Sequence, residues 1–447
     1  MGSTTGAVKL HDIGTSPAQT RQAWSPAAAG DGPAENRISR YLHSLMKCKR
    51  NTCRSVVLLA ALVAGSLSAW ADGYRLPNQD PEAIARGNAF VATADNPSAI
   101  YYNPAGITQL EGQNIRAGLY LVSGGYDYES PTGAKVSANS DFQPVPQLYY
   151  VFSPNDFPLS FGLGVYAPYG LSLDWGQSQP LSTLAQKGDL LYLCFNPVVA
   201  WRINPQLSLG IGPTINYSSA TFERAIGLLP GDQFKADGDG MAYGFNAGIR
   251  WQPLDQWAFG VSYRFPTTVD YHGTTQTTPS PPYPASTSGS SSICFPQYVV
   301  AGVSFRPTEK WNLEFDLDWA DWSAVKSIAF EGTAFGTQVL PLNYRSSFNF
   351  EFGVTRQLGK GYFASLGFFY SENSSPDANF TPLIPDADLY LGSIGFGYRG
   401  KRWDWAIGYQ FGYNPGREVK NDITAPLADG TYHILNQAFN IAATFKF

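Results

Sequence analysis

Apolar and polar residues alternate with a period of two through most of the chain. At the C-terminus, Phe439, Ile441, Ala443, Phe445 and Phe447 are apolar, and the residues between them are polar or small. A strand turns successive side chains to opposite faces, so each such segment predicts a strand with one apolar and one polar face. Fourteen segments of this kind lie near residues 113–125, 143–152, 159–168, 189–203, 207–218, 239–251, 257–266, 294–306, 311–319, 343–357, 361–371, 388–399, 403–413 and 435–447.

The connections between these segments alternate between short turns and long loops. Most segments are long enough for a tilted strand to cross a bilayer, and aromatic residues recur at their ends. Short periplasmic turns, longer outer loops, aromatic girdles and an even strand count are typical of bacterial outer-membrane barrels. A soluble sandwich would also alternate, but it needs neither the girdles nor the rhythm of turns. The pattern therefore predicts an all-β membrane protein, an antiparallel transmembrane β-barrel of about 14 strands.

Composition supports this class and excludes others. Aromatic and charged residues each make up 15% of the 447 residues, whereas a soluble globular chain carries about 25% charged residues. No cluster of basic residues indicates nucleic-acid binding, and the longest apolar run, Val56–Gly65, is too short for a spanning helix. No enzyme motif and no metal-ligand spacing is present, so we expect no catalysis, no cofactor and no metal.

An export signal precedes the predicted barrel. A basic stretch ending at Arg54 is followed by the apolar run and by Ala69-Trp70-Ala71, which has the form of a cleavage site. Residues 46–71 are thus predicted to be a signal peptide. Residues 1–45 are predicted to be an N-terminal extension that results from a translation start assigned too far upstream. In the oxidising compartment beyond, Cys194 and Cys294 could form a disulfide.

Residues 72–112 lack the dyad and cannot join the barrel wall. Asp80-Pro81, Asn96-Pro97 and Asn103-Pro104 each place an N-cap residue before proline, which predicts three short helices or helical turns. We expect this segment to lie in the lumen as a hatch, with a periplasmic tail as the alternative. Residues 113–447 would then form the barrel.

Several runs resemble the FadL-like family of outer-membrane transporters for long-chain fatty acids and aromatic hydrocarbons. The resemblance covers about residues 72–447. The runs that carry it are Gly73-Tyr74-Arg75-Leu76, Ala85-Arg86-Gly87-Asn88-Ala89-Phe90, Asp95-Asn96-Pro97-Ser98-Ala99-Ile100-Tyr101-Tyr102-Asn103-Pro104-Ala105-Gly106 and Tyr166-Ala167-Pro168-Tyr169-Gly170-Leu171.

The resemblance implies passive uptake of hydrophobic compounds, most of all long-chain fatty acids, across a Gram-negative outer membrane. Substrate is caught by the outer loops, passes to a pocket inside the hatch-plugged barrel and leaves sideways at a kinked third strand. The implied partners are the fatty acid or another hydrophobic small molecule, outer-membrane lipid, and the export and barrel-assembly machinery.

The residues fit this mechanism physically. Proline cannot donate a ladder hydrogen bond, so Pro168, with Gly170, is the candidate for a lateral opening near the end of the third strand; alternatively Pro168 only starts a loop. The candidate hatch and gating residues are Asn103, Pro104, Ala105 and Gly106, which could instead form a helix cap without a gating role.

A fatty-acid carboxylate in an apolar lumen requires a cation. Arg264 and Arg345 are predicted to point inward and are the head-group candidates, although they could instead pair with Glu314, Asp316 and Asp318 on the same face. Apolar outer-loop residues offer a first docking surface; they are Ile226, Leu228 and Leu229.

One feature weakens the fatty-acid interpretation. The predicted loop at 267–293 is rich in Pro, Ser and Thr, and the loop at 219–238 is short, which suggests a reduced access groove. The alternative functions are therefore import of aromatic hydrocarbons, a general diffusion porin, and a surface adhesive barrel.

Overall fold

The computed structural model describes residues 73–139, 141–177, 179–281 and 284–447. The predicted extension, the signal peptide and Asp72 lie outside these residues. The helices are α3 (Pro81–Ile84), α4 (Ala99–Tyr102) and the 3-10 turns η1 (Pro104–Gln109), η2 (Trp322–Ala324), η3 (Asp377–Asn379) and η4 (Pro426–Ala428). Among the described residues, no helix is long and apolar enough to span a membrane.

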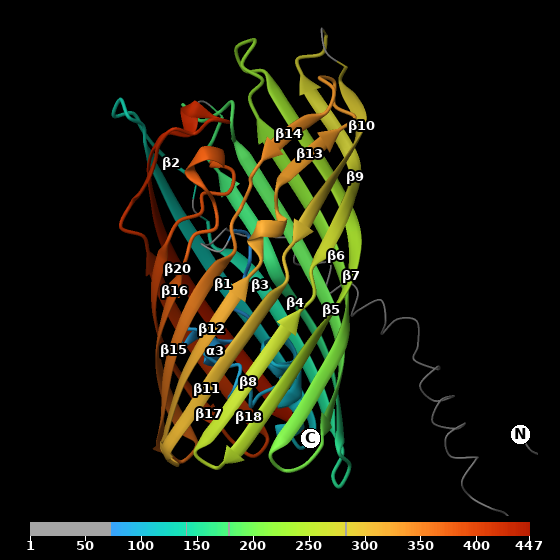
Figure 1. Cartoon of the computed structure of the whole chain (residues 1–447), viewed down its shortest axis with the longest axis vertical. Coiled ribbons are helices and arrows are strands. Elements are labelled where there is room, and N and C mark those ends of the chain that lie inside the picture. Colours follow the sequence, from blue (N-terminus) through green and yellow to red (C-terminus); the bar gives the residue numbers. More distant parts are fainter. Residues whose placement is uncertain (1–72, 140, 178, 282–283) are drawn as a thin grey trace, which may run out of the picture. The chain divides into compact units, whose positions relative to one another are not determined.

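All described strands belong to one sheet (Figure 1). They are β1 (Gly112–Glu129), β2 (Lys135–Ser137), β3 (Gln143–Ser153), β4 (Leu159–Asp174), β5 (Lys187–Arg202), β6 (Leu207–Arg224), β7 (Gln233–Leu254), β8 (Trp257–Arg264), β9 (Thr267–Thr278), β10 (Ser286–Phe295), β11 (Tyr298–Thr308), β12 (Trp311–Ala320), β13 (Ser327–Glu331), β14 (Gln338–Pro341), β15 (Ser347–Gly359), β16 (Tyr362–Ser371), β17 (Leu389–Arg399), β18 (Trp403–Tyr413), β19 (Arg417–Val419) and β20 (Gly430–Lys446).

The sheet closes into a barrel whose wall has 14 antiparallel spans in the described part of the chain. β8 with β9 forms one span and β10 with β11 another, while β2, β13, β14 and β19 are short strands in the long connections. Closure is made by β1 and β20, which pair from Asn114 opposite Lys446 to Glu129 opposite Thr431. This confirms the predicted fold class. Short turns gather at the end that carries the C-terminus, here called the periplasmic end, and long connections at the opposite, outer end (Figure 1).

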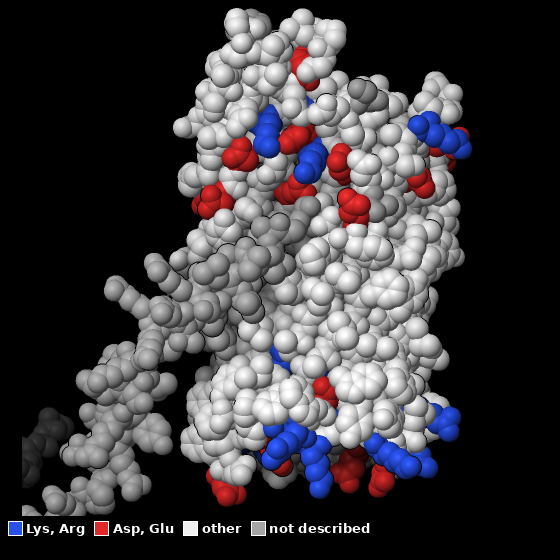
Figure 2. Space-filling model, turned by 180° about the vertical axis from the view of Figure 1, so that it is seen from behind, with Lys and Arg blue, Asp and Glu red and all other residues white. Residues whose placement is uncertain are grey.

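Alternation of side chains produces the two faces of the wall. In β20, Phe439 and Ile441 are exposed by about half on the outside, while Asn440 between them is 3% exposed and faces the lumen. Figure 2 shows the result on one face: charged residues gather toward the two ends, and the band between them is nearly free of charge. An apolar band bounded by polar ends is what a bilayer requires of a barrel.

Two wall spans are interrupted by proline at neighbouring positions. Pro266 separates β8 from β9, and Pro296 separates β10 from β11, because proline cannot continue the hydrogen-bond ladder. Beyond these interruptions, Thr267–Thr278 and Ser286–Phe295 continue the wall and pair with each other. The prediction of a long loop at 267–293 is therefore wrong: its serines and threonines sit on strands that extend the barrel outward.

Residues 73–111, here called the luminal segment, lie inside the barrel. Asp80 caps α3 by accepting from the Glu82 N–H at 2.9 Å, and Asn103 caps η1 by accepting from the Ala105 N–H at 3.2 Å. Both caps agree with the predicted Asp-Pro and Asn-Pro starts. The middle helix α4 begins later than predicted, after Ser98, whose N–H is bonded to the Asn96 side chain at 2.9 Å.

Ion pairs tie the luminal segment to the wall on both sides. Arg75 and Arg86 of the segment reach carboxylates of β12, with N···O distances of 2.6 Å to Asp318 and 2.8 Å to Glu314. Acidic residues of the segment meet arginines of other strands; these pairs are Asp80 with Arg116 (2.5 Å), Glu82 with Arg399 (2.6 Å) and Asp95 with Arg399 (2.8 Å). Since each charge is buried or half-buried and paired, the segment is fixed in position and orientation.

Glycines in the wall let the luminal segment approach closely. A Cβ added at Gly367 of β16 would collide with the backbone of Arg86 and Gly87, and one added at Gly353 of β15 would collide with Arg86. Only a residue without a side chain allows backbone to touch backbone there.

We predict that Gly367→Val unseats the luminal segment while the barrel still forms. The added side chain would occupy the space of Arg86 and Gly87, and overpacking of this kind costs about 1–3 kcal/mol. Single-channel conductance should rise, and trypsin should cleave at Arg86. Gly392→Val on β17 is the matched control, because nothing lies within 4 Å of a Cβ at Gly392. Wild-type conductance together with a protected Arg86 in Gly367→Val would contradict the prediction.

Candidate functional site

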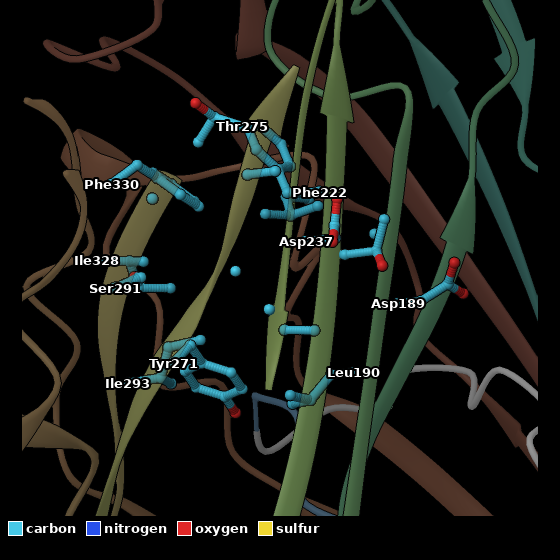
Figure 3. Close-up of a pocket in the computed structure, with 18 of the residues that line it drawn as sticks. Asp189, Leu190, Phe222, Asp237, Tyr271, Thr275, Ser291, Ile293, Ile328 and Phe330 are labelled. Atoms are coloured by element: carbon cyan, nitrogen blue, oxygen red, sulfur yellow. The ribbon is translucent and has the colours of Figure 1, made fainter. Parts of the chain in front are cut away.

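An apolar cavity lies in the outer part of the lumen, between β5, β6, β7, β9, β10 and β13 (Figure 3). It encloses about 760 Å³ of space between atoms, part of it open to solvent. Leu383 and Ile384, from the connection between β16 and β17, cover one side. The larger apolar side chains that line it are Leu171, Leu190, Phe222, Tyr271, Ile293, Ile328 and Phe330.

A row of small residues makes room for the cavity. Ala220 of β6 lies opposite Gly238 of β7, which lies opposite Gly273 of β9, which in turn lies opposite Gly289 of β10. All four line the cavity. Because they are neighbours across four strands and bring almost no side-chain volume, the wall is thin along this row and the lumen widens.

The side chains that point into the cavity are uncharged. Asp189 and Asp237 belong to its lining, but they alternate with the inward-facing Leu190 and Ala236 and so point to the outer face. There Asp189 pairs with Lys187 at 3.0 Å, and Asp237 accepts from a neighbouring threonine hydroxyl. An anionic group in the cavity would therefore meet no cation, which is unfavourable in an apolar site.

The barrel wall is incompletely paired between β3 and β4. The two strands pair only from Leu148 opposite Val165 to Phe152 opposite Phe161. Toward the outer end, β3 contains Pro144 and Pro146, which have no N–H to donate. A single bridge, from the Asn139 N–H to the Asp174 carbonyl at 2.7 Å, closes the break at its outer end.

At this break the luminal segment pairs with β4 through an isolated antiparallel bridge between Arg75 and Tyr169. The Leu76 N–H donates to the Pro168 carbonyl at 2.8 Å, and the Gly170 N–H donates to the Tyr74 carbonyl at 2.9 Å. β4 bulges between Tyr166 and Tyr169, and all its residues from Tyr166 to Leu171 are buried. β4 therefore turns inward at Pro168 and pairs with the luminal segment instead of β3.

Tyr74 connects the break with the cavity. Its ring lines the cavity and packs edge-on against Trp322 and Phe295, with centroid distances of 4.8 and 5.5 Å. Its hydroxyl donates to the Cys294 carbonyl at 2.6 Å, and its own carbonyl pairs with Gly170. One residue thus forms part of the cavity floor and part of the seal of the wall.

Pro168 lies inside a strand in the structure and not at a strand end as predicted. The sequence predicted that the third span ends at 168, but β4 continues to Asp174. The alternative that Pro168 only starts a loop is wrong for the same reason. Its position at the inward turn, with Gly170 beside it, agrees with the predicted place of a lateral opening; the opening itself stays a prediction.

The predicted hatch residues lie on the periplasmic side of the luminal segment, away from the cavity. The Asn103 amide donates to the carbonyls of Val91 at 2.7 Å and Ile249 at 3.0 Å, so it joins the segment to β7. Pro104 and Ala105 pack against Gly210 of β6. Asn103 is thus both a helix cap and a tether to the wall, while a gating role stays a prediction.

Arg264 faces the lumen, as predicted, but is sealed from the cavity. It is 6% exposed and lies among the rings of Tyr101, Tyr166 and Tyr298, 5.4–5.8 Å from their centroids. It donates to the Tyr166 hydroxyl at 2.6 Å. Within the described part of the chain, no carboxylate lies within ion-pair distance of Arg264.

Arg345 does not point inward as predicted. It lies in the coil before β15, where strand alternation does not extend, and its side chain is exposed. It lines a polar cleft at the outer end with residues such as Asp377, Asp388 and Arg417. The structure therefore does not bring Arg264 and Arg345 together. Their expected carboxylate partners on β12 are used instead by Arg75, Arg86 and backbone N–H groups of the luminal segment.

The predicted docking residues lie in one outer loop that a single carboxylate organises. Leu228 and Leu229 are exposed by 66% and 45%, while Ile226 is half-buried. The Asp232 carboxylate accepts four backbone N–H bonds of 2.7–3.1 Å from Ile226, Gly227, Leu228 and Leu229. Burial alone would raise the pKa of Asp232, but these four donors outweigh it and hold the pKa below its usual range.

Both described cysteines are free. Cys194 is buried and Cys294 is half-buried, so the disulfide that the oxidising compartment allowed is not formed. In the part of the chain that the structure describes, no group of three or more His, Cys, Asp or Glu side chains could hold a metal ion.

Sequence reasoning missed Tyr74, the proline pair of β3 and the row of small residues. Tyr74 belongs to one of the runs that carry the family resemblance, but the sequence assigned it no function. The two prolines in one predicted strand were a signal for an unpaired strand edge. The small residues showed no signal, because their proximity depends on the register of four strands.

A closed barrel with a filled lumen, an apolar cavity and a break in its wall is the architecture of an outer-membrane transport protein. The chain belongs to the family of outer-membrane transport proteins described as OMPP1/FadL/TodX, which matches residues 62–447. This membership agrees with the predicted family and with an outer-membrane location.

Individual relatives are distant but match over most of their length. A "Long-chain fatty acid transport protein" from Escherichia coli O6:H1 is 24% identical over 409 residues, covering 81% of this chain and 91% of the relative. "Outer membrane protein P1" from Haemophilus influenzae is 22% identical over 440 residues, covering 86% of this chain and 95% of the relative.

Solved structures show the same fold. A Pseudomonas aeruginosa FadL homologue superposes with a TM-score of 0.74 at 18% identity, covering 84% of this chain and 100% of that chain. The Pseudomonas putida toluene transporter TodX gives a TM-score of 0.68 at 17% identity, covering 83% and 99%.

We predict that Asp232→Asn loosens the outer loop without affecting the barrel. Hydrogen bonds to a charged acceptor contribute about 1.5–3 kcal/mol, so the amides of residues 226–229 should exchange with deuterium at least about tenfold faster than in wild type. Because the pKa of Asp232 is lowered by folding, its contribution is complete above about pH 4 and is lost as the pH falls through the folded-state value. Unchanged exchange at 226–229 at neutral pH would contradict this.

Proposed function

We propose that this protein imports hydrophobic small molecules passively, by binding them in the outer cavity and releasing them sideways through the break between β3 and β4. One observation carries the proposal: Tyr74 belongs both to the cavity lining and to the stretch that pairs with β4 at the break. A ligand that displaces Tyr74 from the cavity therefore also weakens the seal of the wall. Transport without catalysis is part of the proposal.

The seal is suited to opening because only two backbone hydrogen bonds, made by residues 74–76, join it to β4. On the other side of the break, Pro144 and Pro146 of β3 have no N–H groups with which to pair. Within residues 74–76, Arg75 is held by its ion pair with Asp318, and the rest of the luminal segment is fixed by further ion pairs and wall contacts. We therefore expect a local movement at Tyr74, before the ion-paired Arg75. A gating role of Asn103, Pro104, Ala105 and Gly106 would require a further movement of the segment.

Long-chain fatty acids are the first candidate substrate. Relatives that match over about nine-tenths of their length carry the name long-chain fatty acid transport protein, and the cavity is apolar. In this proposal Leu228 and Leu229 provide the first contact at the outer surface. Arg264 serves as a head-group partner only if the tyrosine rings around it move aside.

Uncharged aromatic hydrocarbons are the second candidate, and a specific observation favours them. None of the described residues that line the cavity is a cation, and its inward side chains include Phe222, Phe330 and Tyr271. The rings of Phe222 and Phe330 are stacked with centroids 5.4 Å apart. A neutral planar molecule fits this lining without an uncompensated charge.

A general diffusion porin is disfavoured by the filled lumen. The luminal segment packs against the wall through buried residues from Tyr74 to Thr108. A porin requires an open polar channel.

Uptake into cells tests the proposal directly. Residues 46–447 are expressed in a Gram-negative host that lacks its own fatty-acid transporter, and entry of radiolabelled oleate and of radiolabelled toluene is compared with an empty vector. We expect uptake of at least one of the two. Absence of both, with a heat-modifiable barrel in the outer membrane, would overturn the proposal.

A reversible lock tests the lateral route. Leu76 and Pro168 lie opposite each other in antiparallel pairing, where Cα atoms are about 4.5–5.5 Å apart, a distance that a disulfide spans. The Leu76→Cys/Pro168→Cys protein should lose uptake when oxidised and regain it on reduction, because the cross-link holds the seal closed. Each single variant is the control. Equal uptake in the oxidised and reduced protein would exclude this exit.

A further inference from the structure

A groove with an aliphatic floor runs over the lipid-facing surface of the barrel, near the periplasmic end. Its floor is a cross-strand row in which Leu313 of β12 lies opposite Val354 of β15, and Val354 lies opposite Leu366 of β16. Leu313 and Leu366 are exposed by 42% and 57%. The front strands of Figure 1 that carry the groove are β11, β12 and β15.

Aromatic side chains form the borders of the groove. The row above the floor, toward the membrane centre, contains Phe315 and Phe352, whose rings lie 4.7 Å apart. At the side, Trp257 and Phe305 stack with centroids 4.4 Å apart. Bulky rings therefore border shorter aliphatic side chains, which leaves a shallow depression along the row of Leu313, Val354 and Leu366 where a hydrocarbon chain can lie.

Cations lie directly below the floor. Arg356 follows Val354 by two residues on the same outward face of β15, and its guanidinium lies 5.0 Å from the ring centroid of Trp311. Lys310 precedes Trp311, and its carbonyl accepts from the Gln357 N–H at 2.8 Å, so the two basic residues are neighbours across β12 and β15. Lys360 follows in the adjoining turn.

In the described part of the chain, these cations have no anionic partner. Lys310, Arg356 and Lys360 are exposed, and none of them lies within ion-pair distance of a carboxylate among the residues that the structure describes. Glu309, the acidic residue of the same turn, lines the polar cavity that contains Arg86 and Arg399. Two or three free positive charges therefore remain at the level where a bilayer places its head groups.

We propose that this groove is a binding site for an anionic phospholipid of the periplasmic leaflet. One acyl chain lies along Leu313, Val354 and Leu366, and the phosphate is bound by Lys310 and Arg356. Trp311 lies between the chain and the phosphate, at the depth where indole rings favour the interface. Charge complementarity selects an anionic over a zwitterionic lipid, and the groove selects an acyl chain over a free phosphate. This site is independent of the transport route.

Native mass spectrometry of the purified barrel tests the site. Phosphatidylglycerol and phosphatidylcholine with identical acyl chains are titrated in detergent. Each basic residue near an anionic lipid contributes roughly fivefold in affinity, so Lys310→Gln/Arg356→Gln should weaken phosphatidylglycerol binding about 25-fold and leave phosphatidylcholine unchanged. Inorganic phosphate at the same concentration should not compete.

A matched control uses another periplasmic turn. Lys401 and Arg402 are also exposed, but they lie in the turn between β17 and β18, two strands that do not carry the floor row, so Lys401→Gln/Arg402→Gln should keep wild-type binding. Val354→Phe, which fills the floor, should weaken both lipids. Heat-modifiability in gels confirms that each variant is folded. Equal loss in the two charge variants, or equal affinity of wild type for the two lipids, would overturn the proposal.

Discussion

Charges buried in the lumen hold the structure together at the point where a barrel is otherwise hollow. Arg75 and Arg86 reach into a row of carboxylates on β12, while Asp80, Glu82 and Asp95 reach back to arginines of β1 and β17. Removing one partner would leave a buried charge uncompensated, which is strongly unfavourable. The position of α3, α4 and η1, and with it the closure of the lumen, follows from these pairs.

This anchoring divides the luminal segment into a fixed and a releasable part. From Asp80 onward, the segment has ion pairs, helix caps and backbone contacts with wall glycines. Before Arg75 it has mainly aromatic packing and one backbone pair with β4. The aromatic part touches the cavity, so the releasable part is also the part that a ligand reaches.

The fold could be predicted from the sequence because the alternation of apolar and polar residues depends only on neighbouring positions in each strand. Alternation in segments such as 403–413 and 435–447 predicted strands that the structure confirms as β18 and β20, and asparagine or aspartate before proline located two of the three helical starts. Pro, Ser and Thr at 267–293 misled, because a polar strand that rises beyond the membrane has no apolar face to mark it. The family resemblance and the lack of a dyad in residues 72–112 then predicted that this segment fills the lumen.

The candidate site was less predictable because its parts meet only through register. Ala220, Gly238, Gly273 and Gly289 are far apart in sequence and become one row when four strands align. The alternation of residues in the segment that contains β15 predicted an inward side chain for Arg345, but the strand begins only at Ser347. Tyr74 gains its position from Gly170 and Phe295, which lie about 100 and 220 residues away along the chain.

The bridge between Asn139 and Asp174 gives the break an upper limit, as the pairs from Leu148 to Phe152 give it a lower one. In the proposed route, the break would open as a window of limited height in the side of the barrel, toward hydrocarbon instead of water. A solute that leaves there enters an acyl phase in which it is more soluble than in the medium outside. The partitioning of the solute from water into the bilayer would then set the direction of its transport. Consumption of the solute inside the cell would keep its concentration in the bilayer low.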